Sequence, residues 1–214
     1  LWRTIMEKNK LPLKNQSIIQ LYDVEAATFE VPIYQRNYAW GKDEISALIQ
    51  DIFDAFSNEK PAYYIGTLVT FHKGDQIFEV IDGQQRLTTI NIILKALSIS
   101  FKNKLTYRAR KKSNATILSI PNFDLDEKDY GIQNGFEYAQ GSIKEIVTND
   151  SLDKFKDYFL HNVYIIHYHV PKDIDLNHYF EIMNSRGEQL EKHEIIKARL
   201  YEKLPDDKEK AKFN

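Results

Sequence analysis

The stretch from Phe78 to Thr89, FEVIDGQQRLTT, constrains the fold of this chain more than any other segment. Its apolar beginning predicts a short strand, and Asp82-Gly83 predicts a sharp turn. The apolar spacing that follows predicts a helix with a buried seam, running to about Phe101. A strand that enters a helix through a glycine turn leaves backbone N–H groups free, and the helix dipole favours negative charge there. With the donor-rich side chains of residues 84–86, this pattern predicts an anion site, and phosphate is the expected ligand. Asp82-Gly83 alone would be compatible with a plain turn.

Three other regions have clear periodicity. Apolar residues between Ile45 and Phe56 fall on one face of a predicted helix that begins at Asp43. Residues 63–71 and 77–81 predict a hairpin with its turn at 72–75. Residues 151–160 predict a helix and residues 163–170 a strand. His167 and His169 share one face of that strand, a spacing compatible with a metal. No third ligand is evident, and ordinary strand histidines are commoner.

Residues 102–150 are the least informative part of the chain. The basic cluster 108–112 and the acidic cluster 124–129 are expected to be solvated faces or loops. Gly131, Gly135 and Gly141 suggest broken helical pieces. No repeat or linker divides the chain, so we expect one domain over residues 1–214 with a helical insert at about 102–150.

Composition excludes several classes of protein. The chain has no cysteine, so disulfides and thiolate metal sites are excluded. Its net charge is −2, so any DNA contact must be local. The longest apolar runs are of strand length, and a cytoplasmic protein without a membrane partner is expected. No Walker-type loop, nucleophile elbow or His-Glu-x-x-His motif occurs. Glu79 lacks the second acid and the lysine of a restriction-type carboxylate cluster, so no DNA-cutting centre is visible.

Three polar motifs remain: Gln35-Arg36, residues 82–86 and residues 184–187. Each contains an arginine, whose planar fork suits bidentate phosphate binding. Asp82 is a candidate ligand for Mg²⁺, which suits a triphosphate. The aromatic residues near the first motif either stack on a base or DNA, or pack in the core. These aromatic residues are Tyr34, Tyr38 and Trp40.

The segments Pro32–Trp40, Ile81–Thr89 and Phe180–Leu190 occur in an order that resembles the N-terminal domain of GmrSD-type modification-dependent restriction enzymes. The resemblance covers about residues 15–200, apart from the region 102–150. It implies an α+β fold with a core similar to the ParB and sulfiredoxin nucleotide-binding fold. In that fold a small mixed sheet is surrounded by helices, here with a helical insertion.

The resemblance also implies a function. It implies a domain that binds and hydrolyses a nucleoside triphosphate with Mg²⁺ in defence against phage DNA. The implied partners are DNA, including modified DNA, an HNH-type nuclease domain or subunit, and further copies of the chain. A binding switch without turnover of its own is the alternative. The implied nucleotide-binding residues are Gln35, Arg36, Asp82, Gly83, Gln84, Gln85, Arg86, Thr88, Asn184, Arg186 and Gly187. The implied catalytic residues are Asp82, Arg86 and Glu181, of which Asp82 or Glu181 would orient the attacking water.

Overall fold

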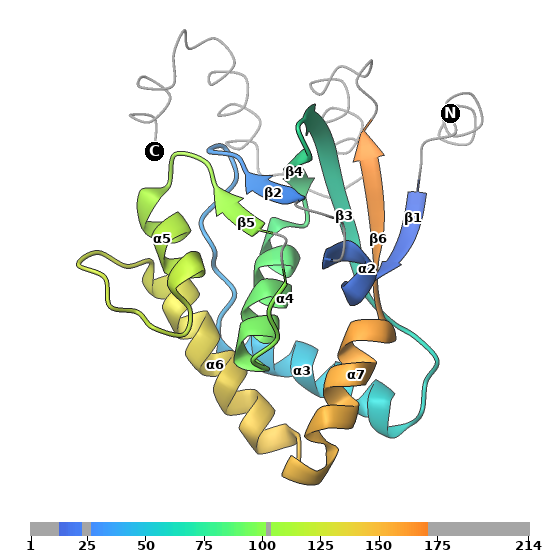
Figure 1. Cartoon of the computed structure of the whole chain (residues 1–214). Coiled ribbons are helices and arrows are strands. Elements are labelled where there is room, and N and C mark those ends of the chain that lie inside the picture. The colour runs from blue at the N-terminus through green and yellow to red at the C-terminus, as the bar shows by residue number, and fades with distance from the viewer. Residues whose placement is uncertain (1–12, 23–26, 102–103, 171–214) are drawn as a thin grey trace, which may run out of the picture.

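The computed structural model describes residues 13–22, 27–101 and 104–170, which form an α+β fold (Figure 1). The strands are β1 (Leu13–Ser17), β2 (Thr28–Val31), β3 (Tyr63–Gly74), β4 (Ile77–Asp82), β5 (Lys104–Tyr107) and β6 (Val163–Val170). The helices are α2 (Ile18–Tyr22), α3 (Lys42–Ser57), α4 (Gln84–Ala96), α5 (Lys111–Ser119), α6 (Tyr130–Ile146) and α7 (Leu152–His161), with a 3₁₀ turn η1 (Asn149–Ser151) before α7.

The strands form one mixed sheet in the order β1-β6-β3-β4-β2-β5. Strands β3 and β4 are an antiparallel hairpin, as the sequence predicts, whereas β3 pairs in parallel with β6, and β2 pairs in parallel with both β4 and β5. The predicted turn at 72–75 is misplaced, because β3 continues to Gly74. The turn itself is formed by Asp75 and Gln76, whose φ angles of 47° and 59° suit a tight hairpin with the natural strand twist.

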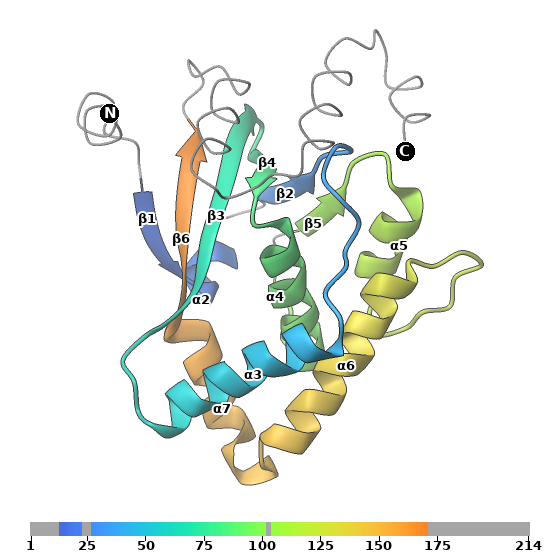
Figure 2. The same ribbon diagram turned by 180° about the vertical axis from the view of Figure 1, so that it is seen from behind.

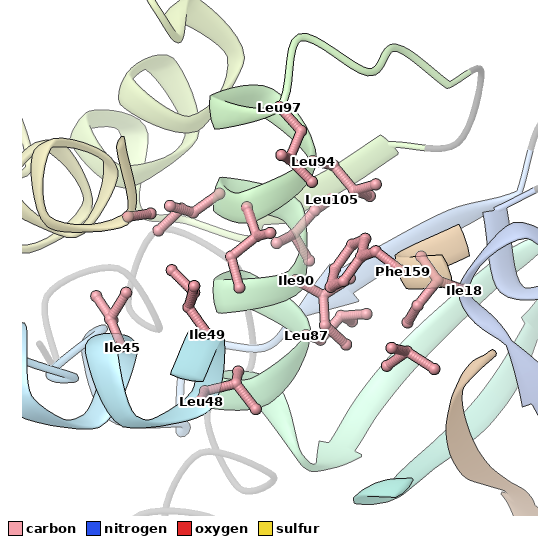
Figure 3. Close-up of a cluster of buried hydrophobic side chains, with 14 of the residues drawn as sticks. Ile18, Ile45, Leu48, Ile49, Leu87, Ile90, Leu94, Leu97, Leu105 and Phe159 are labelled. Carbon is pink, nitrogen blue, oxygen red and sulfur yellow. The ribbon is translucent and has the colours of Figure 1, made fainter. Parts of the chain in front are cut away.

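Helix α4 is the centre of the core. The sequence predicts one buried seam, but the helix buries ten of its 13 residues. The reason is that the sheet lies on one side of α4 and helices α3 and α6 lie on the other (Figure 1). The apolar side chains of α4 and of the elements around it form one cluster, in which Figure 3 labels Ile18, Ile45, Leu48, Ile49, Leu87, Ile90, Leu94, Leu97, Leu105 and Phe159. The helix also ends before Phe101, where Ser98 takes a φ of 59° and Ile99 N–H bonds to Leu94 O (2.8 Å) in a left-handed cap.

The region 102–150 is not purely helical. It begins with β5, which pairs with β2 and is the last strand in the sheet order, and only then continues into α5 and α6. Helix α6 is unbroken from Tyr130 to Ile146, so the interpretation of its glycines as helix breaks is wrong. Gly131 and Gly135 instead let the helix approach Tyr38 closely, since a Cβ on either would lie 2.8 and 2.9 Å from Tyr38 atoms.

The other predicted elements are present with small shifts. Helix α3 begins at Lys42 and buries the expected face, helix α7 spans Leu152–His161, and β6 spans Val163–Val170. None of the helices in the described ranges combines the length and apolar character that a membrane span requires.

Candidate nucleotide site

The junction between β4 and α4 has the predicted geometry. Gly83 is the N-cap of α4 with a φ of 88°, a left-handed conformation that disfavours any other residue. A Cβ at this position would lie 2.6 Å from the carbonyl oxygen of Thr67 in β3. The turn therefore needs glycine for two reasons, its backbone angles and the close passage of β3. The N–H groups of the first helical turn have no partner within the helix, which makes this end a donor-rich site.

The loop that carries the first polar motif lies against this junction. Gln35 Nε2 donates to Ile81 O (2.6 Å), and Gln84 Nε2 donates to Arg36 O (3.1 Å). Figure 2 shows the loop descending from β2 beside α4 to the start of α3. Two of the three polar motifs, more than 40 residues apart in sequence, are thus brought together.

Gln85 holds the same loop at two points. Its Nε2 donates to Asn37 O (2.9 Å), and its Oε1 accepts from the Ala39 N–H (2.9 Å). Gln35, Gln84 and Gln85 are 8%, 3% and 8% exposed. The sequence predicts phosphate contacts for these residues, but their side chains bond to strand and loop backbone instead. A phosphate contact by Gln84 or Gln85 would have to use the backbone N–H.

Arg86 is oriented by β3. Its Nε and one terminal nitrogen donate to Thr67 O (3.2 and 2.8 Å), and the same terminal nitrogen lies 3.4 Å from Asp82 Oδ2. Gly66 lies beside the guanidinium, where its φ of 135° favours glycine, and a Cβ there would be in van der Waals contact with Arg86 Nε (3.4 Å). The Arg86 and Asp82 side chains stay partly exposed, at 29% and 46%. Both are accessible to a ligand at the junction.

Two predicted contact residues are buried instead. Thr88 has no exposed surface; its hydroxyl donates to Gln84 O (2.8 Å) and lies 2.7 Å from the Tyr107 hydroxyl. Its position one turn into α4 points it at β5, so in this structure its side chain cannot reach a nucleotide. Tyr38 is 4% exposed and its hydroxyl lies 2.8 Å from Thr89 Oγ1, while burial raises its pKa. Of the two alternatives for Tyr38, stacking on a base or DNA and packing in the core, the structure shows packing in the core.

The other two aromatic residues differ from Tyr38. Trp40 is half-buried and packs against the core, while Tyr34 is half-buried and its hydroxyl donates to Glu79 Oε1 (3.3 Å). Arg36 is exposed on the loop. The third motif, residues 184–187, and Glu181 lie outside the described residues.

Sequence reasoning misses Arg110, which it assigns to a solvated basic cluster. The Arg110 side chain is half-buried and donates to the carbonyl oxygens of Ile33, Gln35 and Arg36. Its position follows from the pairing of β5 with β2, because the Arg108 N–H bonds to Val31 O (2.9 Å) and carries the chain past the loop. No local pattern signals this pairing, since β5 has only four residues.

The strand histidines share one face as predicted, and a third histidine lies nearby. The His167 and His169 rings are 4.0 Å apart and both bond to Thr70 Oγ1, while His72 stacks on Phe78, which also contacts His169. Within residues 13–22, 27–101 and 104–170, no group of three or more His, Asp or Glu side chains is arranged to hold a metal. The arrangement supports ordinary strand histidines.

This cluster predicts a loss of stability at mildly acidic pH. His167 Nδ1 lies 2.6 Å from Gln16 Oε1 and Nε2 lies 2.9 Å from Thr70 Oγ1, which suits a neutral ring. Burial, with His169 and Lys14 nearby, lowers the His167 pKa to about 3. The unfolded chain, with an ordinary pKa near 6.5, therefore binds the proton first. The contribution of His167 to the free energy of unfolding is therefore complete above about pH 6.5. Between about pH 6.5 and pH 3 the free energy of unfolding falls by about 1.4 kcal/mol for each pH unit.

Urea unfolding at pH 7.5 and pH 5.5 measures this loss. We expect His167→Gln to have the shallower pH dependence, whereas the exposed His161→Gln should follow the unaltered protein. Equal slopes for all three proteins would contradict the assignment to His167.

Comparison with known proteins identifies the family of this chain. The family model described as the GmrSD restriction endonuclease, N-terminal domain, matches residues 16–201, which include both described polar motifs. A search of curated proteins finds no match. Because the family model covers most of the chain, this protein belongs to the GmrSD restriction endonuclease N-terminal domain family.

Proposed function

We propose that this chain binds a nucleoside triphosphate at the β4–α4 junction and hydrolyses it, as the nucleotide-sensing part of a DNA restriction system. One observation carries the proposal. The Gln35-Arg36 turn is hydrogen-bonded to Ile81 and Gln84, so that two motifs distant in sequence lie together at a helix N-terminus. Membership of a restriction endonuclease family supports the biological context.

The phosphates would occupy the N-terminus of α4. The backbone N–H groups of residues 84–86 and the helix dipole favour an anion there, and Arg36 and Arg86 supply two cations. Asn184, Arg186 and Gly187 are the proposed closing residues. Tyr34 and Trp40 are the proposed contacts to base or DNA, because they keep part of their surface exposed while Tyr38 does not.

The residues at the junction fit a magnesium ion. Mg²⁺ is usually bound by one or two carboxylates together with substrate phosphates, and Asp82 presents a half-exposed carboxylate beside the helix N-terminus. Asp82 would hold the ion, which would neutralise charge on the phosphate oxygens. Arg36 and Arg86 would stabilise the charge that develops on the γ-phosphate as water attacks, and Asp82 or Glu181 would orient the water.

We propose that DNA cleavage belongs to a separate HNH-type nuclease domain or subunit, because this sequence has no cutting signature. DNA, including modified phage DNA, would then be sensed by local contacts, since the net charge is −2. Assembly of several copies is proposed from the same resemblance.

Phosphate release from GTP, ATP, CTP and UTP tests the proposal, with and without Mg²⁺. Arg36→Ala should abolish turnover, whereas Lys95→Ala, at the opposite end of α4, should not. Tight binding without release would support the alternative of a nucleotide switch. No binding of any of the four nucleotides by the unaltered protein would refute the proposal.

A further inference from the structure

The turn that carries Gln35 and Arg36 is held by a cation from a distant segment. Arg110 donates from one terminal nitrogen to Arg36 O (3.1 Å) and from the other to Ile33 O (3.1 Å) and Gln35 O. Three carbonyl groups of one short turn therefore point at a single guanidinium. A planar guanidinium carries its donors in a fixed fork, so this arrangement specifies the conformation of the turn.

Among the described residues Arg110 forms no ion pair, although the Asp129 carboxylate is near enough to favour its charged form. Within the part of the chain that the structure describes, its hydrogen bonds go to carbonyls, and no carboxylate lies within ion-pair distance. Burial lowers its pKa, although arginine stays protonated at any physiological pH. Arg110 therefore adds positive charge beneath the same turn that exposes Arg36.

Helix α6 holds the other side of the loop. Gly131 and Gly135 lie one helical turn apart, and Tyr38 packs closely against both. A Cβ at Gly131 would lie 2.8 Å from Tyr38 O, and a Cβ at Gly135 would lie 2.9 Å from Tyr38 Cε1. Gly141, on the same helix, has no atom within 4 Å of its virtual Cβ. Among these three glycines, the close contacts are therefore confined to the two that lie against the loop.

The same region also contacts the start of α4. Tyr107, the last residue of β5, places its hydroxyl 2.7 Å from Thr88 Oγ1, and Thr88 bonds to Gln84 O (2.8 Å). The region from β5 to α6 consequently contacts both halves of the candidate site, the loop and the first turn of the helix.

We propose that Arg110 is a positioning residue for nucleotide binding, through which the region 104–146 sets the conformation of the Gln35-Arg36 turn. This inference rests on the proposed function. Arg110 would act without touching the nucleotide, by fixing the carbonyls of the turn so that the Arg36 backbone stays beside Gln84 at the helix N-terminus. A change in β5, α5 or α6 would then alter the affinity for triphosphate.

The test compares Arg110→Ala and Arg110→Lys with Lys111→Ala, a matched loss of charge at an exposed neighbouring position. Calorimetry with the four nucleoside triphosphates measures affinity, and amide hydrogen exchange of residues 33–38 measures the order of the turn. We expect Arg110→Ala to bind about tenfold more weakly or worse, which is the scale of lost hydrogen bonds to a charged group. The amides of residues 33–38 should also exchange faster in this variant. Arg110→Lys should lose less affinity, and Lys111→Ala should bind as the unaltered protein does.

The outcomes separate the two proposals. Faster exchange in Arg110→Ala with unchanged affinity would overturn the positioning role, as would equal losses of affinity in Arg110→Ala and Lys111→Ala. If Arg110→Ala does not fold, Arg110→Lys decides the question, because it keeps the charge and removes the fork. No binding by the unaltered protein would refute the proposed function itself, and the positioning role would fall with it.

Discussion

Replacing Arg86 by alanine is expected to weaken triphosphate binding by about 1.5–3 kcal/mol, the usual contribution of hydrogen bonds to charged groups. Arg86 lies at the N-terminus of α4 with part of its side chain exposed, and Thr67 O fixes the orientation of its guanidinium (2.8 Å). An arginine held in this way loses little entropy when it binds phosphate. Titration calorimetry with each triphosphate in Mg²⁺ buffer measures the change.

Two controls make this experiment specific. Arg86→Lys keeps a charge but cannot make the two-pronged contact with Thr67 O, so it should recover only part of the affinity. Lys95→Ala removes a charge from the other end of the same helix and should leave affinity unchanged. Thermal melting of each variant is needed, since Arg86 also satisfies a strand carbonyl. Full affinity in a folded Arg86→Ala protein would contradict the proposed pocket.

Replacing Gly83 by alanine should have the largest effect on stability, a loss of about 2–5 kcal/mol in the free energy of unfolding. A left-handed φ costs a residue with a Cβ about 1–2 kcal/mol, and the rest comes from overlap. The added methyl group would meet Thr67 O at 2.6 Å and the Leu68 Cα at 3.2 Å, which are backbone atoms of a central strand. Strand β3 or the start of α4 must therefore move. Urea unfolding measures the loss.

Gly74→Ala is the matched control for this variant. Gly74 also has a positive φ, 117°, but no atom lies within 4 Å of its virtual Cβ. Its replacement should show only the cost of the backbone angle, about 1–2 kcal/mol. The difference between the two variants isolates the contact with β3. Equal losses would show that this contact contributes nothing.

Local signals in the sequence suffice for the centre of the molecule. The strand, the glycine turn and the start of α4 are all predictable, because the apolar spacing and Asp82-Gly83 act within a few residues. The meeting of Gln35 and Arg36 with residues 81–84 is inferred from the resemblance and not from spacing. The hydrogen bonds that join them link residues 46 and 48 positions apart, which no periodicity encodes.

Side-chain direction is what sequence reasoning could not supply. Gln84 and Gln85 are donor-rich and lie at a helix N-terminus, so phosphate is a natural expectation for them. In the structure the loop already occupies their amides. For Arg110 the error is the opposite one. A basic cluster is usually solvated, so no contact with the protein is expected for Arg110, but the pairing of the four-residue strand β5 with β2 brings it beneath the turn.

Because α4 is enclosed on almost every side, its first turn cannot shift toward or away from an arriving ligand without disturbing the whole interior. The amide groups of this turn are therefore held in place by the fold, and a ligand bound there as we propose would need little free energy to arrange them. If a nucleotide binds here as we propose, any closure around it must come from chain segments outside this helix.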